Sequence, residues 1–110
     1  MVMPLTRAFR ETVRARAERD LLFREALLRQ AVQDLLDGDA AGGRAAMREA
    51  INATIGFERL GEIVGKSPKS LMRMFGPDGN PTAENLLAVI RALQIETGVH
   101  LTVQAAADAA

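Results

Sequence analysis

The chain has 110 residues, enough for a single domain with one hydrophobic core. Apolar residues make up 48% of it and charged residues 25%, which is typical of a globular protein and excludes general disorder. It contains no cysteine, so disulfides, thiolate catalysis and sulfur-ligated metals are excluded. The formal net charge is zero, which argues against a protein that coats nucleic acid through charge alone.

Neither membrane insertion nor export is indicated by the sequence. The longest apolar runs are far shorter than the roughly 20 residues that a membrane span needs. The arginine-rich start lacks the apolar centre of a signal peptide. We therefore expect a cytoplasmic protein without a membrane partner.

A first helix is predicted after Thr6, which is placed to cap it. Its apolar side is narrow and consists of Phe9, Val13 and Ala17. Seven arginines lie within residues 7–29, and acidic residues are interleaved among them. This pattern is typical of a solvated helix face with oppositely charged pairs one turn apart, and contact with DNA or a partner is the alternative. The interleaved acids are Glu11, Glu18, Asp20 and Glu25.

The second predicted helix covers residues 21–36 and begins after Asp20 as its N-cap. Its apolar band is too wide for a helix with one buried side, so it needs partners on two sides. Those partners are either other helices of the chain or a second copy, and the second alternative suggests a homodimer. Gly38 is predicted to end this helix and Asp39 to open a third, whose start is uncertain because of the glycines at 42–43.

Two short helices joined by a tight turn are predicted for residues 57–75. The first has apolar residues at the spacing of one buried stripe and ends at Gly65. A glycine inside a helix costs roughly 1 kcal/mol relative to alanine, so Gly61 implies that a neighbouring segment approaches closely. The stripe consists of Phe57, Leu60, Gly61 and Val64.

The second helix of this pair is predicted to start at Ser67 as N-cap, with Pro68 in its first position. Residues 66–76 contain three cations and no anion. Two helices that cross steeply over a short turn are typical of a helix-turn-helix, whose second helix is free to enter a DNA major groove. One side of the second helix buries Leu71, Met74 and Phe75, and the other carries Lys69, Ser70 and Arg73.

The loop GPDGNPT follows, and Thr82 is placed to cap a strongly helical segment over residues 83–94 that closes over the pair. Apolar and polar residues then alternate, which allows a short strand within residues 98–104. A lone strand is not stable, so it would pair with a second copy or with another protein's edge. Residues 1–4 and 105–110 are predicted to fray.

The chain resembles the small helix-turn-helix proteins of the Cro/repressor type. More closely, it resembles the probable addiction-module antidote proteins, the antitoxins of bacterial type II toxin-antitoxin pairs. The resemblance is found in the stretch INATIGFERLGEIVGKSPKSLMRMFGPDGNPTAENLLAVI and, more weakly, in FRETVRARAERD with the helix ending at LLDGD. The string GKSPKSLMRMFGPDGNPT is fairly specific to the family. The resemblance implies an operator upstream of the chain's own operon and a small RelE-like or ParE-like toxin as partner.

By position, the resemblance implies exposed places on a recognition helix for four residues between 67 and 73. It puts Asn80 in the loop that approaches the phosphate backbone. Lys66 departs from the pattern, because many such proteins have an apolar residue in the turn, and we expect it to reach a phosphate. The predicted DNA-binding residues are Lys66, Ser67, Lys69, Ser70, Arg73 and Asn80.

The chemistry of these side chains fits a DNA groove. Lys69 and Arg73 are one helical turn apart, so both can point into the groove, and a solvated basic helix is the alternative. Arginine can bind guanine O6 and N7 together, worth about 1 to 3 kcal/mol of discrimination. We expect the Ser67 side chain mainly to cap the helix, and in addition to contact a phosphate. The N–H groups that follow Thr54 and Gly56 are a further candidate for phosphate.

We expect no enzymatic activity, no cofactor and no metal. The sequence has no nucleophile near a histidine base, no glycine-rich phosphate loop between strand and helix, and no paired carboxylates beyond surface charge. His100 is the sole histidine and has no partner for a metal. A cluster of Met72, Met74 and Phe75 is predicted to be core, with Met72 partly outward, and a ligand pocket is the alternative.

These observations predict an all-α single domain of five or six helices with a Cro/repressor-like helix-turn-helix and, if it forms, one short C-terminal strand. The parts are N-terminal helices at 7–53, a helix-turn-helix core at 54–95, the strand at 98–104 and the tail at 105–110. The expected function is repression of transcription by a homodimer on a double-stranded operator, together with neutralisation of a toxin. The alternative is an interaction module that masks a partner, which the surplus N-terminal helices favour.

Overall fold

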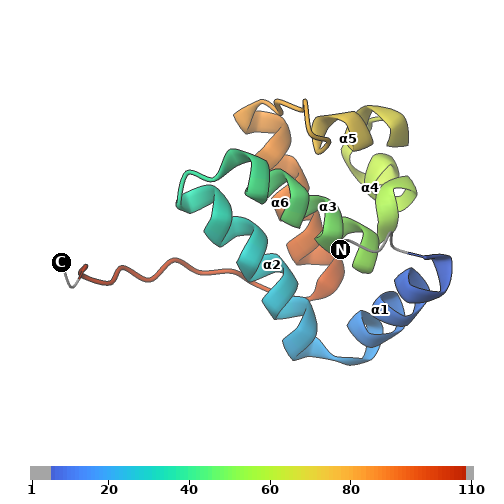
Figure 1. Ribbon diagram of the computed structural model, residues 1–110, viewed down its shortest axis with the longest axis horizontal. Coiled ribbons are helices and arrows are strands. Elements are labelled where there is room, and N and C mark those ends of the chain that lie inside the picture. Colours follow the sequence, from blue (N-terminus) through green and yellow to red (C-terminus); the bar gives the residue numbers. More distant parts are fainter. Residues whose placement is uncertain (1–5, 109–110) are drawn as a thin grey trace.

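Six helices make up most of residues 6–108, the part of the chain that the computed structural model describes (Figure 1). The predicted all-α class with five or six helices is therefore confirmed. The predicted fraying of residues 1–4 lies outside the described residues, as do positions 109–110. The helices are α1 (Arg7–Arg19), α2 (Leu21–Leu36), α3 (Ala40–Ala53), α4 (Gly56–Val64), α5 (Pro68–Met74) and α6 (Ala83–Thr97).

Five of these helices begin at the capping residue that the sequence predicts. In each case the side-chain oxygen accepts a hydrogen bond from the backbone N–H three residues later, which satisfies one of the free donors of the first turn. The exception is α4, whose N-cap Ile55 makes no side-chain bond. The capping pairs are Thr6 with Phe9 (3.0 Å), Asp20 with Phe23 (3.2 Å), Asp39 with Gly42 (2.9 Å), Ser67 with Ser70 (3.1 Å) and Thr82 with Asn85 (3.1 Å).

The uncertain start of the third helix is resolved by packing between α2 and α3. Gly38 takes a left-handed φ of 82° after α2, and α3 begins at once with Ala40. A Cβ on Gly43 would overlap the end of the Leu35 side chain, so glycine lets the end of α2 lie close to the first turn of α3 without a shift of that side chain. The glycine thus serves the contact between helices and does not delay the helix.

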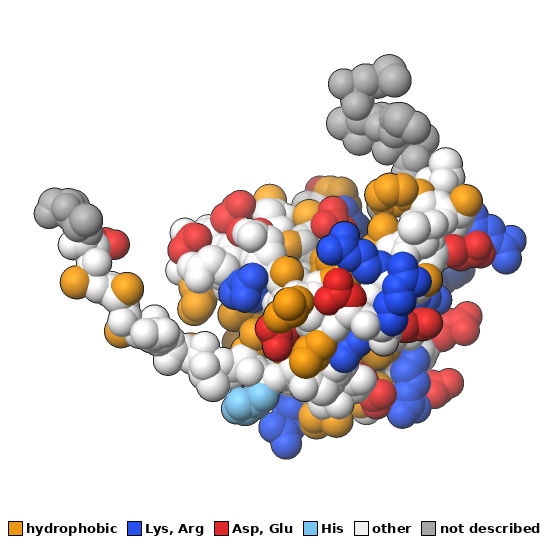
Figure 2. All heavy atoms as spheres, turned by 90° about the horizontal axis from the view of Figure 1, so that it is seen from below, with side chains coloured by type: hydrophobic (Ala, Val, Ile, Leu, Met, Phe, Trp, Pro, Cys, Tyr) orange, Lys and Arg blue, Asp and Glu red, His pale blue; other side chains and the backbone are white. Residues whose placement is uncertain are grey.

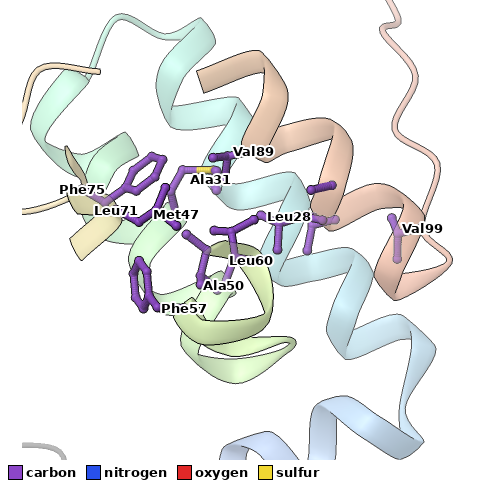
Figure 3. Packing of buried hydrophobic residues seen from close by; sticks show 13 residues of the cluster. Leu28, Ala31, Met47, Ala50, Phe57, Leu60, Leu71, Phe75, Val89 and Val99 are labelled. Carbon is purple, nitrogen blue, oxygen red and sulfur yellow. The ribbon is translucent and has the colours of Figure 1, made fainter. Parts of the chain in front are cut away.

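One cluster of buried side chains contains residues from all five helices from α2 to α6 and holds them together (Figure 3). The middle of the wide apolar band of α2 is covered within the chain, because α2 packs against α1, α3 and α6. Leu28 and Ala31 are buried there, whereas Leu22 and Leu36 at the two ends are exposed. The band therefore finds its two-sided partners without a second copy. The fully buried large side chains are Met47, Ile51, Leu60, Leu71, Phe75, Val89 and Leu93.

The strand allowed for residues 98–104 does not form in the described chain. Residues 99–108 have no regular structure, and the exposed residues 102–108 extend away from the helices (Figure 1, Figure 2). Val99 is buried and Leu101 half-buried, and the Leu101 N–H donates to Gln94 Oε1 at 2.8 Å, so the root of this segment is fixed. Farther out, Val103 is exposed.

Two of the N-terminal arginines bind backbone carbonyls, which corrects the prediction that this whole set is a solvated face. Arg14 donates from Nη2 to the carbonyl of Asn52 at 2.9 Å, at the end of α3. Arg24 donates to Ala17 at 2.7 Å and to Thr97 at 3.1 Å, at the ends of α1 and α6. Cations at helix C-termini are favoured by the free carbonyls and the helix dipole. The predicted pairs one turn apart are present as Arg7 with Glu11 (3.2 Å) and Arg16 with Asp20 (3.6 Å).

No helix of residues 6–108 has the length and apolar character required to span a lipid bilayer.

Candidate nucleic-acid interface

The turn between α4 and α5 is built around two glycines. Gly65 ends α4 with a left-handed φ of 71°, and its N–H donates to the carbonyl of Gly61 at 2.9 Å. The N–H of Lys66 donates to the same carbonyl at 3.1 Å. A Cβ on Gly61 would lie 2.5 Å from the carbonyl oxygen of Lys66, so the close approach predicted at Gly61 is confirmed. The turn itself, residues 65–67, is the segment that approaches.

Replacing Gly61 by alanine tests this contact. We expect Gly61→Ala to lower the free energy of unfolding by about 1 to 3 kcal/mol, because the added methyl group meets backbone that must shift. The better helix propensity of alanine offsets up to about 1 kcal/mol of this loss. Urea unfolding followed by circular dichroism measures the difference.

The matched variant is Gly65→Ala, where nothing lies within 4 Å of an added Cβ but φ is 71°. It is expected to cost about 1 to 2 kcal/mol through backbone strain alone. If Gly61→Ala proves as stable as the wild type, the turn is not packed against α4 as described.

Helix α5 shows its cationic side to solvent, as predicted. Leu71 and Phe75 have exposed fractions of 0% and lie in the core beside Met47 (Figure 3). Lys69 and Arg73 are exposed. The helix is therefore held to the body by one side and free on the other. Of the remaining predicted residues, Ser67 is exposed, and Lys66 and Ser70 are half-buried.

The cations of α5 and its turn have no acidic partner in the described part of the chain. None of the ion pairs among residues 6–108 includes Lys66, Lys69 or Arg73. By contrast, Arg59 on α4 pairs with Glu62 at 3.2 Å and with Glu96 at 3.1 Å. Its hydrogen bond with Glu62 and the nearby charge of Glu96 raise the pKa of Arg59 above its ordinary value. The α5 charges are thus available to an anionic ligand.

Two arginines of α3 hold the C-terminal end of α5, a role that sequence reasoning missed. Arg48 donates from Nη1 to the carbonyl of Phe75 at 2.7 Å. Arg44, one helical turn earlier, donates to the carbonyls of Gly76 at 3.2 Å and Pro77 at 3.1 Å. Their spacing on one face of a helix was visible in the sequence, but the carbonyls they meet lie in the distant segment that follows α5, which only the fold brings to α3. These bonds fix the direction of α5.

The loop after α5 separates Asn80 from the other predicted residues. Gly79 lies against the end of α5, because a Cβ there would overlap the carbonyl oxygen of Met74. Asn80 is exposed and lines a shallow hollow with Leu35 and Arg44, next to the connection between α2 and α3. The structure therefore brings together Lys66, Ser67, Lys69, Ser70 and Arg73 on α5 and its turn, while Asn80 lies at the hollow beside the connection between α2 and α3.

Three other candidate features lie outside this set of residues. The hydroxyl of Thr54 donates to the carbonyl of Ala50 at 2.6 Å, at the end of α3. Met74 is half-buried against the core, and Met72 is 49% exposed, as the predicted core assignment required. His100 is exposed, and within residues 6–108 no group of three His, Cys, Asp or Glu side chains is placed to hold a metal ion.

A second hollow lies between α1, α2 and α3. It has a volume of about 360 Å³ and an apolar floor that includes Phe9, Val13, Phe23 and Leu27. Arg48, which holds the end of α5, also lines it. We call this hollow the α1 groove; its apolar side chains could contact an apolar protein segment.

Comparisons with protein-family models, with curated proteins and with solved structures find no match to this chain. The resemblance to antidote proteins therefore depends on the motif residues alone.

Proposed function

We propose that this chain is a sequence-specific DNA-binding regulator that acts in the cytoplasm as a homodimer. Each copy places α5 in a major groove of a palindromic operator. Two-fold symmetry would set the half-sites about one helical turn of DNA apart. In keeping with the motif resemblance, we further propose that it is the antitoxin of a toxin-antitoxin pair, represses its own operon and neutralises a small RelE-like or ParE-like toxin.

The observation that carries this proposal is the orientation of α5. A helix anchored by Leu71 and Phe75 with unpaired Lys69 and Arg73 on its open side has the shape and charge that a major groove accepts. The zero net charge of the chain supports specific rather than general binding, since little affinity would come from the protein as a whole. Arg44 and Arg48 support it by fixing the helix direction.

The proposal predicts that the protein selects a sequence from a pool of random DNA duplexes and binds the DNA upstream of its own coding region. The double substitution Lys69→Ala with Arg73→Ala should weaken binding to the selected sequence by at least about a hundredfold, because two groove contacts are lost. Electrophoretic mobility shift at fixed salt measures this. The control is Arg29→Ala, which removes an exposed cation on α2 and should leave binding unchanged.

If no sequence is enriched, or if the double variant binds as the wild type does, then α5 is not the DNA-reading element. The alternative, a module that masks a protein partner, would then be favoured by the α1 groove. Phe9→Ala, at an exposed residue of that groove, should weaken capture of a co-expressed toxin and leave DNA binding intact. Loss of DNA binding by Phe9→Ala in a folded protein would contradict this division of surfaces.

A further inference from the structure

The outer face of α6 is exposed although its inner face closes over the core. Leu87 is 65% exposed and Ile95 is 64% exposed, two helical turns apart. With Glu84, Ala88 and Arg91 they occupy an arc of roughly 100° on the helix, the width of a packing face. All five are exposed. We call these five residues the α6 face.

The charges of the α6 face on one copy are complementary to those on a second copy related to it by a two-fold rotation. Glu84 and Arg91 lie two turns apart, and neither takes part in an ion pair within residues 6–108. In a two-fold contact, residue i of one copy meets residue j of the other, and j meets i. An antiparallel pair of α6 helices with its axis between Leu87 and Ala88 would bring Glu84 to Arg91 twice.

The apolar residues of the face fit the same register. Leu87 of each copy would lie on Ala88 of the other, whose small side chain lets the two helices approach. Ile95 would face the segment just before α6 in the second copy, where Pro81 is half-buried. Beside Ile95, a hollow of about 290 Å³ bounded by Arg91 and Val99 leaves room for that segment.

A different register is disfavoured by charge. An axis through Arg91 would set Leu87 against Ile95, but it would place the two Arg91 side chains against each other at the centre. Like charges in direct contact are destabilising. Of these two antiparallel arrangements, the charges of the α6 face favour the one that pairs Glu84 with Arg91.

We propose that α6 is the self-association surface of this chain and that its occupant is the α6 of a second copy, packed antiparallel with Glu84 on Arg91. This interface would serve the dimer that the proposed function needs. It is argued from α6 alone, so it is tested without DNA, and failure of DNA binding would not affect the outcome.

Charge reversal tests the proposal by analytical ultracentrifugation. Glu84→Arg alone and Arg91→Glu alone should each weaken dimerisation about tenfold or more, since each creates two like-charge contacts. The protein with both substitutions should dimerise as the wild type does. An equimolar mixture of the two single variants should form a heterodimer, because both contacts are then attractive.

The controls are Glu58→Arg on α4 and Arg29→Glu on α2, which make the same charge changes at exposed positions off the α6 face. Both should dimerise normally. A monomeric wild type, or single variants that dimerise like the wild type, would overturn the proposal. Failure of both the double variant and the mixture to restore dimerisation would overturn the register, while recovery in the mixture shows that the single variants are folded.

Discussion

Phe75→Ala is expected to lower the free energy of unfolding by about 3 to 5 kcal/mol. Phe75 has an exposed fraction of 0%, and its ring lies beside Leu71 and Met47 where α5 meets α3 (Figure 3). Removing the ring leaves a cavity in the one cluster that joins α2 to α6. A loss of this size is a large share of the roughly 5 to 15 kcal/mol that stabilises a domain. Urea unfolding followed by circular dichroism gives the value.

The control is Met72→Ala on the same helix. Met72 is 49% exposed, so truncation should change the free energy of unfolding by no more than about 0.5 kcal/mol. Comparing the losses in free energy of unfolding caused by Phe75→Ala and Met72→Ala shows which side of α5 faces the rest of the domain. Equal effects of the two substitutions would mean that α5 is not anchored through Phe75.

The sequence was sufficient wherever a structure depends on residues a few positions apart. Ser67 bonds to the N–H of Ser70, and Gly65 bonds to Gly61, so the turn and the start of α5 follow from local chemistry. The buried side of α5 follows equally from the spacing of Leu71 and Phe75. Five of the six predicted DNA-binding residues lie in this turn or in α5. Their positions depend on the same local chemistry, which is why the orientation of α5 was predictable.

What the sequence did not reveal depends on contacts between distant segments. Arg48 lies 27 positions from Phe75, and Arg24 lies 73 positions from Thr97, so nothing in their own neighbourhood indicates the carbonyls that they bind. The strand that alternation allows at residues 98–104 also depends on a distant segment, and it does not form in the described chain. Alternation describes which side of an extended segment is apolar, whereas a strand also needs a second strand beside it.

The missed contacts matter for the proposed function because a recognition helix must be held firmly to read bases. Helix α5 has only seven residues, too few for its own hydrogen bonds to keep it rigid. Its direction is set at one end by the Ser67 cap and the contact at Gly61. At the other end it is set by Arg44 and Arg48. The base contacts proposed for Arg73 would need this support, since bidentate hydrogen bonds tolerate little misplacement.

Arg73→Ala and Lys69→Ala are expected to weaken DNA binding in different ways. Arginine reads guanine with two hydrogen bonds worth about 1 to 3 kcal/mol, so Arg73→Ala should weaken binding to the selected operator by about ten- to a hundredfold and relax the preference at one base pair. Lys69→Ala should weaken binding to all duplexes alike and reduce the slope of log K against log salt by about 1. Fluorescence anisotropy with operator and scrambled duplexes at several salt concentrations separates the two effects.

Arg73→Lys provides the decisive comparison because it keeps the positive charge and removes the planar pair of donors. It should retain the salt dependence of the wild type and lose the discrimination between operator and scrambled DNA. If Arg73→Lys discriminates as well as the wild type, Arg73 contributes charge only. Specificity would then have to come from Ser67, Ser70 or the shape of the DNA, and the assignment of Arg73 to a base edge would be wrong.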